Sequence, residues 1–340
     1  MVDHPSSLVG LKPQFFNLFG YMSFFVDFLT TCSIVGIWPR FIEPRMLKTT
    51  KLKWKLDKEV SHLDGIKIVH LTDLHLNAKT SQKFLDKIVR RVNWLKPDLI
   101  LFTGDFLCYS HLECPQRLSS FLSRLEASLG SYCSFGNHDY AKYVTLSREG
   151  VYDLLPPPNP LSGVLRGLRT LFTPLKTGTE VSEKVLSISV NEELCQLLRS
   201  TPFKLLENTT VTLPIGLNLS GLGDLALGRC HPKTAFLGYN PQFPGIVLSH
   251  NPDSLPRLLD YPGDWILCGH THGEQIHIPW PKWGREISKK LARLQNRAYT
   301  RGLFTVGNHK KLYVNRGLGC HKPFRLFSPP EICLITAVKD

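Results

Sequence analysis

Short apolar runs alternate with amphipathic stretches in the first half of the chain. The runs at 66–72 and 98–103 have the length and apolar content of buried strands. Between them, apolar residues recur at helical spacing, which predicts a helix over 80–95. A second helix is predicted over about 115–129, and a short strand leads into Gly136. These elements follow a regular β-α-β-α-β order.

The second half of the chain is dominated by predicted strands with few helices between them. Strands are predicted at 211–213, 217–222, 246–249, 265–268, 275–278, 312–315 and 332–338. Two packed β-sheets flanked by helices, an α/β half followed by an α+β half, accommodate both patterns. The stretch between them, about 140–209, has few periodic signals, so it is either a loop that shapes substrate access or a variable surface excursion.

Residues 15–38 form a nearly continuous apolar stretch ahead of these elements. Its length suffices to cross a hydrocarbon core of about 30 Å. Asp27 interrupts it, and a carboxylate at the centre of a spanning helix costs about 2.5–3.5 kcal/mol, so an interfacial helix competes with a true span. A buried core helix and a signal peptide are weaker alternatives, because the stretch lacks a polar stripe and only Lys12 precedes it. We therefore expect a membrane-associating helix.

The positive charge of the chain is concentrated behind this apolar stretch. The chain carries 41 Lys plus Arg against 28 Asp plus Glu, a formal net charge of +13. Cations that follow the stretch directly are Arg40, Arg45, Lys48, Lys51, Lys53, Lys55 and Lys58. Such a cluster attracts anionic lipid and marks the cytoplasmic side by the positive-inside rule. Because Lys51, Lys53 and Lys55 alternate with apolar residues, the exposed face of an edge strand is an alternative for part of this run.

A second basic block spans 282–301. As a helix it would place on one face the apolar residues Ile287, Leu291, Leu294 and Ala298. The other face would carry Arg285, Lys289, Lys290, Arg293 and Arg297. This pattern is typical both of a helix on a lipid surface and of a solvated helix packed on the core. A nucleic-acid partner is not expected, because the cations lie beside apolar helices and do not alternate with exposed aromatics along a groove.

Length and composition are compatible with one catalytic domain. With 340 residues and 42% apolar content, the chain can form a domain over 61–340 behind an N-terminal segment over 1–60. Insertions are expected at about 140–209 and 281–302. The 9 cysteines are scattered without C-x-x-C pairs, which indicates reduced thiols in a cytoplasmic setting and not a disulfide framework.

Five short blocks of metal-preferring residues follow apolar runs. They contain Asp73 and His75, then Asp105, then Asn137, His138 and Asp139, then His250, and finally His270 and His272. Carboxylate, imidazole and amide donors without a thiolate favour manganese, iron or zinc pairs over a structural zinc site. Residues two apart in a strand point to one face, so Asp73 and His75 are expected to bind one ion together. Asp105 can offer one oxygen to each of two ions.

The order and spacing of these blocks resemble the signature of the calcineurin-like metallophosphoesterases over roughly residues 65–338. The resemblance implies a four-layer fold, with two mixed β-sheets between helices, and two divalent ions. By position, it implies that one ion is held by Asp73, His75, Asp105 and His272. The other would be held by Asp105, Asn137, His250 and His270. One such block alone is a weak signal, whereas all five in order are specific.

The paired blocks predict two-metal hydrolysis of a phosphate bond. Two cations about 3.5–4 Å apart would clamp phosphate oxygens and lower the pKa of the attacking water. The resemblance also implies that His138 faces the substrate phosphate, where an imidazole can protonate the leaving oxygen. Asp139 is expected to orient that imidazole, although Asp also begins helices as an N-cap. Arg316 is a candidate phosphate contact or, alternatively, a surface cation in a turn.

The apolar leader, the basic flank and the motifs together resemble the membrane-associated branch that contains the bacterial UDP-2,3-diacylglucosamine pyrophosphatases of lipid A biosynthesis. This resemblance implies hydrolysis of UDP-2,3-diacylglucosamine to 2,3-diacylglucosamine 1-phosphate and UMP, with manganese, on the cytoplasmic side of the bacterial inner membrane. The motifs themselves indicate only phosphoester or diphosphate hydrolysis. Two alternatives stay open: a phosphatase or phosphodiesterase of a cyclic nucleotide, phospholipid or nucleic acid, and a non-catalytic interaction module that kept the fold.

Overall fold

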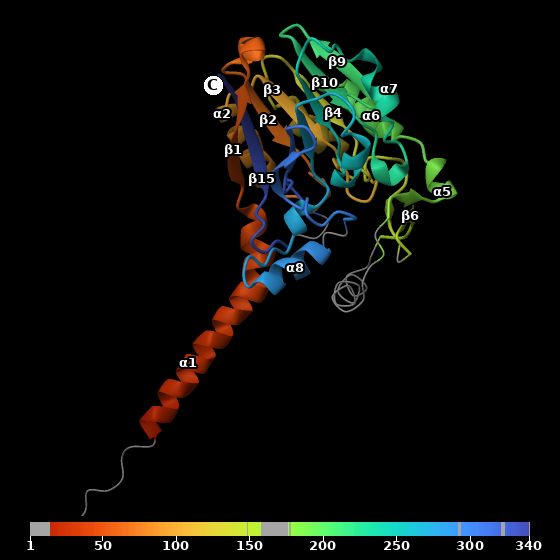
Figure 1. Cartoon of the computed structure of the whole chain (residues 1–340). Helices are drawn as coiled ribbons and strands as arrows, with labels where there is room; N and C mark the ends of the chain where they lie inside the picture. The colour runs from red at the N-terminus through yellow and green to blue at the C-terminus, as the bar shows by residue number, and fades with distance from the viewer. Residues whose placement is uncertain are drawn as a thin grey trace, which may run out of the picture.

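A layered body and one projecting helix make up the structure (Figure 1). The computed structural model describes residues 14–147, 149–157, 176, 178–291, 294–320 and 324–339. Residues 158–175 of the insertion predicted at about 140–209, together with Lys12 and Arg293, lie outside the described residues. The two predicted sheets are both present.

The first sheet has six strands in the order β1-β15-β2-β3-β4-β8. Their bounds are β1 Lys48–Leu56, β2 Lys67–Leu71, β3 Leu99–Thr103, β4 Ser131–Ser134, β8 Phe203–Leu205 and β15 Glu331–Lys339. Strands β2, β3, β4 and β8 are parallel, β15 is antiparallel to β2, and β1 is parallel to β15. Because β1 pairs with β15, the body begins at Lys48, ahead of the predicted domain boundary at 61.

Helices cover the outer face of this sheet. They are α2 Gln82–Trp94, α3 Pro115–Ser123 and α6 Glu192–Arg199. The buried face of α2 is the predicted apolar stripe, including Leu85, Ile88 and Val92, which packs on strand residues such as Phe102. The second predicted helix is shorter than expected, ending at Ser123. Both faces of the central strands are therefore buried, as their continuous apolar runs indicate.

The second sheet has the strand order β13-β14-β12-β11-β10-β9. Their bounds are β9 Thr209–Leu213, β10 Leu217–Gly221, β11 Gly245–Leu248, β12 Trp265–Cys268, β13 Gly302–Val306 and β14 Lys310–Val314. Its inner face packs against the first sheet, where Ile68 and Leu101 join Leu248 and Leu267 in one buried cluster. Its outer face is covered by short helical elements, which are α7 Pro232–Ala235, η4 Leu225–Leu227, η5 Phe236–Gly238 and η6 Pro252–Arg257. The four-layer architecture is thereby confirmed.

Two segments differ from the sequence prediction. The stretch expected to be irregular contains a small sheet of β5 Val144–Leu146, β6 Val151–Leu154 and β7 Glu180–Val181, together with α5 Glu183–Leu186. The strand predicted at 275–278 is wrong, because Gln275 has a positive φ of 56° and only the single bridge Ile276↔Leu326 forms there. A left-handed residue cannot continue an extended strand.

The two basic regions adopt different structures. In β1, Lys51, Lys53 and Lys55 are exposed and alternate with less exposed apolar residues, which confirms the edge-strand interpretation. The short helix η3 Lys58–Leu63 then leads into β2. Among the described residues of the second basic block, 282–291 and 294–301, only α8 Lys282–Leu291 is helical, so Leu294 is buried from an irregular segment and not from the predicted helical face.

The N-terminal apolar stretch is helical, as predicted. Helix α1 Gln14–Cys32 continues as the π-helical η1 Ser33–Ile42 and the short η2 Glu43–Arg45. The segment Met22–Arg45 has 24 residues and a mean hydropathy of 1.4, so its length and composition suffice to cross a membrane. Only 6% of its most apolar part is buried against the body, and α1 projects away from the sheets in Figure 1. A buried core helix is therefore the wrong interpretation of this segment.

We expect Trp54→Ala to destabilise the body through the core between the sheets. Trp54 is 7% exposed and its ring centroid lies 6.3 Å from that of Trp265. Removing a buried aromatic side chain costs about 3–5 kcal/mol, partly through the cavity left behind. Thermal or urea unfolding in detergent would measure the loss. Trp94→Ala, at a side chain 68% exposed, is the matched control and should change stability by less than about 0.5 kcal/mol.

Candidate metal centre

The metal-preferring residues all follow strand ends at one edge of the two sheets. Asp73 and His75 follow β2, Asp105 follows β3, Asn137 and His138 follow β4, His250 follows β11, and His270 and His272 follow β12. These are the carboxyl ends of parallel strands, which meet at a common edge. Seven candidate donor residues from two sheets therefore converge.

The backbone that delivers these donors is left-handed. Positive φ angles occur at Asp73 (53°), His75 (47°), Asp105 (60°), His270 (70°) and His272 (50°). Non-glycine residues rarely adopt this conformation, which costs free energy and clusters at functional sites. The expectation that Asp73 and His75 share the face of a strand is wrong, since β2 ends at Leu71. Irregular backbone turns, and not strand alternation, bring the two side chains together.

Glycine is required at two positions beside the carboxylates. A Cβ on Gly136 would lie 2.3 Å from Asp105 Oδ1, and a Cβ on Gly269 would lie 2.3 Å from Asp73 Oδ2. Such contacts are far inside van der Waals distance. Gly136, before Asn137, therefore lets the backbone of its loop approach the carboxylate of Asp105. Gly269, before His270, does the same for the carboxylate of Asp73.

The first donor cluster consists of Asp73, His75, Asp105 and His272. His75 Nε2 lies 3.7 Å from Asp73 Oδ1, 3.4 Å from Asp105 Oδ2 and 3.1 Å from His272 Nε2. His272 Nε2 is 3.6 Å from Asp73 Oδ1. Two atoms that each lie about 2.1 Å from one ion are roughly 3.0–3.4 Å apart in octahedral or tetrahedral coordination. The spacing in this cluster therefore fits a single divalent ion.

The second donor cluster consists of Asp105, Asn137, His250 and His270. His250 Nε2 lies 3.1 Å from Asp105 Oδ2 and 3.3 Å from His270 Nδ1. His270 Nδ1 is in turn 3.0 Å from Asn137 Oδ1. These separations also fit one ion, and Asp105 belongs to both clusters. Oxygen and nitrogen donors without sulfur suit a borderline or hard divalent metal.

Backbone carbonyls orient three of the imidazoles. The Nδ1–H of His75 donates to Leu107 O at 3.0 Å. In the same way, His250 Nδ1–H donates to Thr103 O at 2.6 Å, and His272 Nδ1–H donates to Gly319 O at 3.2 Å. This bond fixes the tautomer and leaves each Nε2 lone pair directed at the clusters. Asn137 Nδ2 likewise donates to Val144 O at 3.2 Å, which turns its Oδ1 toward His270.

Burial and close opposite charges shift the pKa values of the donors. Burial opposes the ionisation of both Asp73 and Asp105. The nearby His272 nevertheless holds the pKa of Asp73 below its usual range, and His250 does the same for the pKa of Asp105. Burial likewise opposes protonation of His250, but Asp105 raises its pKa well above the usual value. Burial and His250 lower the pKa of His270 to about 4. Protons and divalent cations therefore compete for the same buried, electron-rich positions.

His138 lies against the first cluster without being one of its donors. A ring nitrogen of His138 falls within 4.8 Å of donor atoms from His75 and Asp105. The backbone N–H of Tyr109 donates to its Nδ1 at 2.8 Å, so the neutral ring carries its proton on Nε2. The rings of Tyr109 and Tyr143 lie beside it, with centroids at 5.6 and 4.8 Å. This imidazole is thus held in the tautomer that can donate a proton from Nε2.

Asp139 does not orient this imidazole, contrary to the sequence expectation. Its carboxylate accepts the backbone N–H groups of Asp105 at 2.6 Å, Gly136 at 3.0 Å and Leu107 at 3.1 Å. Burial, followed by the charge of Asp105, raises its pKa to about 7. Asp139 therefore holds together the two loops that carry Asp105 and Asn137. The Tyr109 backbone takes the orienting role.

Arg316 is also placed differently from both sequence interpretations. It is 8% exposed, and its Nε and Nη2 donate to the two oxygens of Glu331 at 3.0 and 2.9 Å. A buried, bidentate ion pair is neither a surface cation nor a guanidinium available to a substrate phosphate. It fixes the loop after β14, where Gly317 lies directly against Asp73.

A comparison with protein families and individual proteins identifies this arrangement. The family model "Calcineurin-like phosphoesterase" matches residues 66–274, which carry every donor of both clusters. The chain belongs to this family. It is 46% identical over 311 residues to the "UDP-2,3-diacylglucosamine pyrophosphatase LpxG" of Chlamydia muridarum, covering 90% of this chain and 94% of the relative. The Chlamydia trachomatis protein of the same name is 43% identical over the same shares.

More distant relatives share the family assignment. The "Uncharacterized metallophosphoesterase YkuE" of Bacillus subtilis is 30% identical, with 87% of each chain covered. Family membership makes this chain a phosphohydrolase that depends on a binuclear divalent-metal centre, and the two donor clusters match such a centre. The identity of the metal and the substrate are separate questions.

Sequence reasoning missed residues that support the donors of this phosphoesterase. Thr72 donates from Oγ1 to Asp73 Oδ2 at 2.8 Å, and the backbone N–H of His138 donates to Asp105 Oδ1 at 2.9 Å. Thr72 lies directly before a donor, so its position was a usable signal. The carbonyls of Leu107 and Gly319 carry no side-chain signal and become visible only in the fold.

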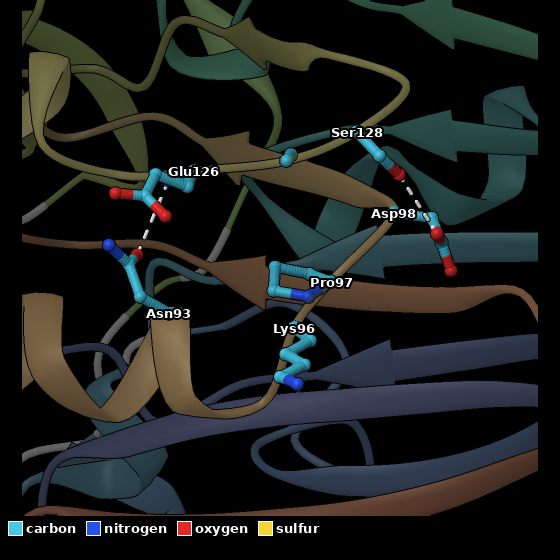
Figure 2. Close-up of a pocket in the computed structure, with 7 residues that line it drawn as sticks. Asn93, Lys96, Pro97, Asp98, Glu126 and Ser128 are labelled. Carbon is cyan, nitrogen blue, oxygen red and sulfur yellow. Dashed lines mark hydrogen bonds between the residues drawn. The ribbon is translucent and has the colours of Figure 1, made fainter.

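A surface hollow of about 460 Å³ lies elsewhere in this phosphoesterase (Figure 2). It is lined by Asn93, Lys96, Pro97, Asp98, Glu126, Ala127 and Ser128. Its polar groups bond to one another, as Ser128 Oγ donates to Asp98 Oδ1 at 2.9 Å and Glu126 N donates to Asn93 Oδ1 at 3.3 Å. It lies where β3 begins, at the edge opposite the donors, and we assign it no part in the chemistry.

We expect Asp105→Asn to weaken divalent-metal binding by more than about 100-fold, because it removes a charge shared by both donor clusters. Titration of the metal-free protein with Mn²⁺, followed by calorimetry, measures the change. Asp86→Asn is the matched control, since this surface carboxylate pairs with Arg124 at 2.7 Å and touches no donor. Unchanged affinity in the Asp105 variant would contradict the assignment of the shared ligand.

Proposed function

We propose that this chain hydrolyses the diphosphate of UDP-2,3-diacylglucosamine, releasing UMP and 2,3-diacylglucosamine 1-phosphate. The observation that carries the proposal is the 46% identity to the chlamydial UDP-2,3-diacylglucosamine pyrophosphatase, which extends over 90% of this chain. The identity thus extends well beyond the metal motifs. The convergence of all seven donors supports hydrolysis over a non-catalytic interaction role.

Manganese is the proposed metal, as the family resemblance implies, and the two clusters together offer carboxylates, imidazoles and one amide without a thiolate, a set that suits manganese, iron or zinc. When bound, two such cations polarise the phosphoryl oxygens and make a water nucleophilic near neutral pH. The first ion would be held by Asp73, His75, Asp105 and His272. The second would be held by Asp105, Asn137, His250 and His270.

His138 is the proposed proton donor to the leaving phosphate oxygen. Its Nδ1 is occupied by the Tyr109 N–H, so its Nε2–H is the group available for donation. The imidazole is 3% exposed, which keeps bulk water from competing for this proton. Asp139, which accepts the Asp105 backbone N–H, and the His138 backbone N–H, which donates to Asp105 Oδ1, hold together the two loops that carry His138 and Asp105. General acid catalysis of this kind contributes about 10²–10⁴-fold to a rate.

We place the protein on the cytoplasmic face of a bacterial inner membrane, anchored by the segment Met22–Arg45. This segment is apolar and mostly exposed, and the cations of the adjoining β1 follow it directly, which favours a cytoplasmic body by the positive-inside rule. A nucleotide-lipid substrate is itself held in the bilayer by its acyl chains. An enzyme anchored beside the bilayer therefore meets this substrate without extracting it first.

A phosphodiesterase acting on another substrate is the second candidate. The chain is 28% identical to the "Phosphodiesterase YaeI" of Escherichia coli, with 80% of this chain and 82% of the relative covered. The metal centre alone suits either bond, because its ions would act on the phosphoryl group that both substrates contain. The higher identity and wider coverage of the chlamydial relatives favour the diphosphate.

Purified full-length protein in detergent should release UMP from UDP-2,3-diacylglucosamine when Mn²⁺ is present and not after chelation. We expect His138→Asn to lower kcat by about 10²–10⁴-fold while Mn²⁺ binding is retained, because the variant loses the proton donor and keeps every metal ligand. His231→Asn, at an exposed histidine on the surface, is the matched control and should retain full activity.

Two outcomes would contradict the proposal. If UMP is not released while bis(p-nitrophenyl) phosphate is cleaved, the diphosphate assignment fails and the second candidate replaces it. If the His138 variant keeps full activity, the proton donor lies elsewhere.

A further inference from the structure

The anchoring segment Met22–Arg45 and helix α8 both join the body at the edge that carries the metal donors. Strand β1 is parallel to β15, and β15 is antiparallel to β2, so β1 begins at the edge where β2 ends. The anchoring segment therefore enters the body beside Asp73 and His75. Helix α8 follows β12 and packs against η7 His272–Glu274, which begins with a metal donor. In Figure 1, α8 lies close to the end of the body from which α1 projects.

A buried carboxylate fixes the anchor to this edge. Glu43, at the end of the apolar segment, is 3% exposed and accepts hydrogen bonds from the backbone N–H groups of Phe327 at 3.0 Å and Ser328 at 2.5 Å. It also accepts from Trp38 Nε1 at 2.9 Å, and Arg325 N donates to Pro39 O at 2.7 Å. Hydrogen bonds thus hold the anchoring segment against residues 325–328, in addition to its covalent connection to β1.

The same segment connects the anchor to the metal centre and to α8. Ser328 Oγ donates to His272 O at 2.9 Å. Leu326 exchanges backbone bonds with the segment 275–277, as His277 N donates to Leu326 O at 2.8 Å and Leu326 N donates to Gln275 O at 3.0 Å. That segment runs directly into Trp280 and α8. The anchor, the metal centre and α8 therefore share one hydrogen-bonded framework.

Large apolar side chains are exposed along this framework. They are Trp38, Phe41, Ile42, Trp280, Trp283 and Phe327. Trp280 is 81% exposed and Trp283 is 64% exposed, so water surrounds side chains that a soluble protein normally covers. Tryptophan is enriched where membranes meet water, because its ring is apolar and its N–H is polar.

Cations accompany these aromatics. Exposed or half-buried basic residues on the same elements are Arg40, Arg45, Lys282, Arg285, Lys289 and Lys290. Among the residues of α8, Glu286 is the acidic one, and it accepts a hydrogen bond from Lys289 at 3.3 Å. Apolar side chains surrounded by cations complement an anionic phospholipid surface. A protein partner is disfavoured, because this face is continuous with a helix long enough to span a bilayer.

We propose that α8, Trp280 and the exposed side of η1 form a docking surface for an anionic bilayer. Trp280 and Trp283 would lie at headgroup depth, and the metal centre would then open beside the lipid. The inference deepens the proposed membrane-bound function and rests on it, because it assigns the surface that orients the catalytic edge toward its lipid substrate.

Depth-dependent quenching tests the docking surface. Full-length protein reconstituted into phosphatidylcholine–phosphatidylglycerol vesicles is compared in lipid with brominated and ordinary acyl chains. Subtracting the emission of Trp280→Phe or Trp283→Phe from that of the parent chain isolates each tryptophan. We expect bromine to quench these two components at least about twofold, since an interfacial helix buries its apolar face by roughly 5–10 Å.

Trp94 provides the matched control, because it is 68% exposed at the end of α2, at the opposite edge of the first sheet. Its component, isolated with Trp94→Phe, should be unaffected by bromine. The phenylalanine variants keep the surface apolar and should fold normally. If the Trp280 and Trp283 components are quenched no more than the Trp94 component, the docking surface is overturned.

Quenching requires no turnover, so its failure is distinguishable from failure of the proposed function. Protein that releases UMP with Trp283 unquenched would keep the function and lose the docking surface. Protein that releases no UMP while Trp283 is quenched would lose the substrate assignment and keep the docking surface. Replacing phosphatidylglycerol by neutral lipid should reduce the quenching of both tryptophans, and an unchanged value would contradict the role of the cations.

Discussion

One buried carboxylate, Asp105, joins the two halves of this structure. Its Oδ2 lies 3.4 Å from His75 Nε2 on the first sheet and 3.1 Å from His250 Nε2 on the second. Its Oδ1 accepts the backbone N–H of His138. Such a concentration of buried polar groups is costly unless each is compensated. Divalent cations shared through Asp105 would satisfy groups that the protein alone satisfies only in part.

The surrounding fold holds the donor side chains around Asp105 in place. Parallel strands of two sheets end at one edge, and left-handed residues such as Asp73 and His270 then turn their side chains inward. The strain of these turns is offset by bonds from well-buried neighbours, including Thr72 to Asp73 and the three carbonyls that orient imidazoles. Rigidity of this kind is what a preorganised metal site requires.

The identity of the donors could be predicted from the sequence, whereas the way they are delivered could not. The blocks at Asp73, Asp105 and His250 predict a metal centre, because residue type and order along the chain can be read directly from the sequence. The geometry depends on left-handed backbone turns, which bring Asp73 and His75 together beyond the end of β2 and which strand alternation does not describe. Asp139 and Arg316 were misassigned because their partners, the Leu107 N–H and Glu331, are distant in the sequence.

The fold was predictable where both faces of a strand are buried. The apolar runs at β2, β3 and β12 are continuous because helices or a second sheet cover both sides. Prediction failed at 275–278, where the apolar residues contact the segment around Leu326 from an irregular backbone. The apolar N-terminal segment was recognisable by its length and composition, but its attachment through Glu43 to the catalytic edge is a tertiary feature.

Anomalous diffraction from crystals of the manganese-loaded protein, recorded at the manganese absorption edge, tests the central claim most directly. We expect two peaks about 3.5–4 Å apart, each surrounded by one of the two donor clusters, with Asp105 in contact with both. A single peak, or two peaks of which Asp105 contacts only one, would contradict the shared-carboxylate centre on which the mechanism depends.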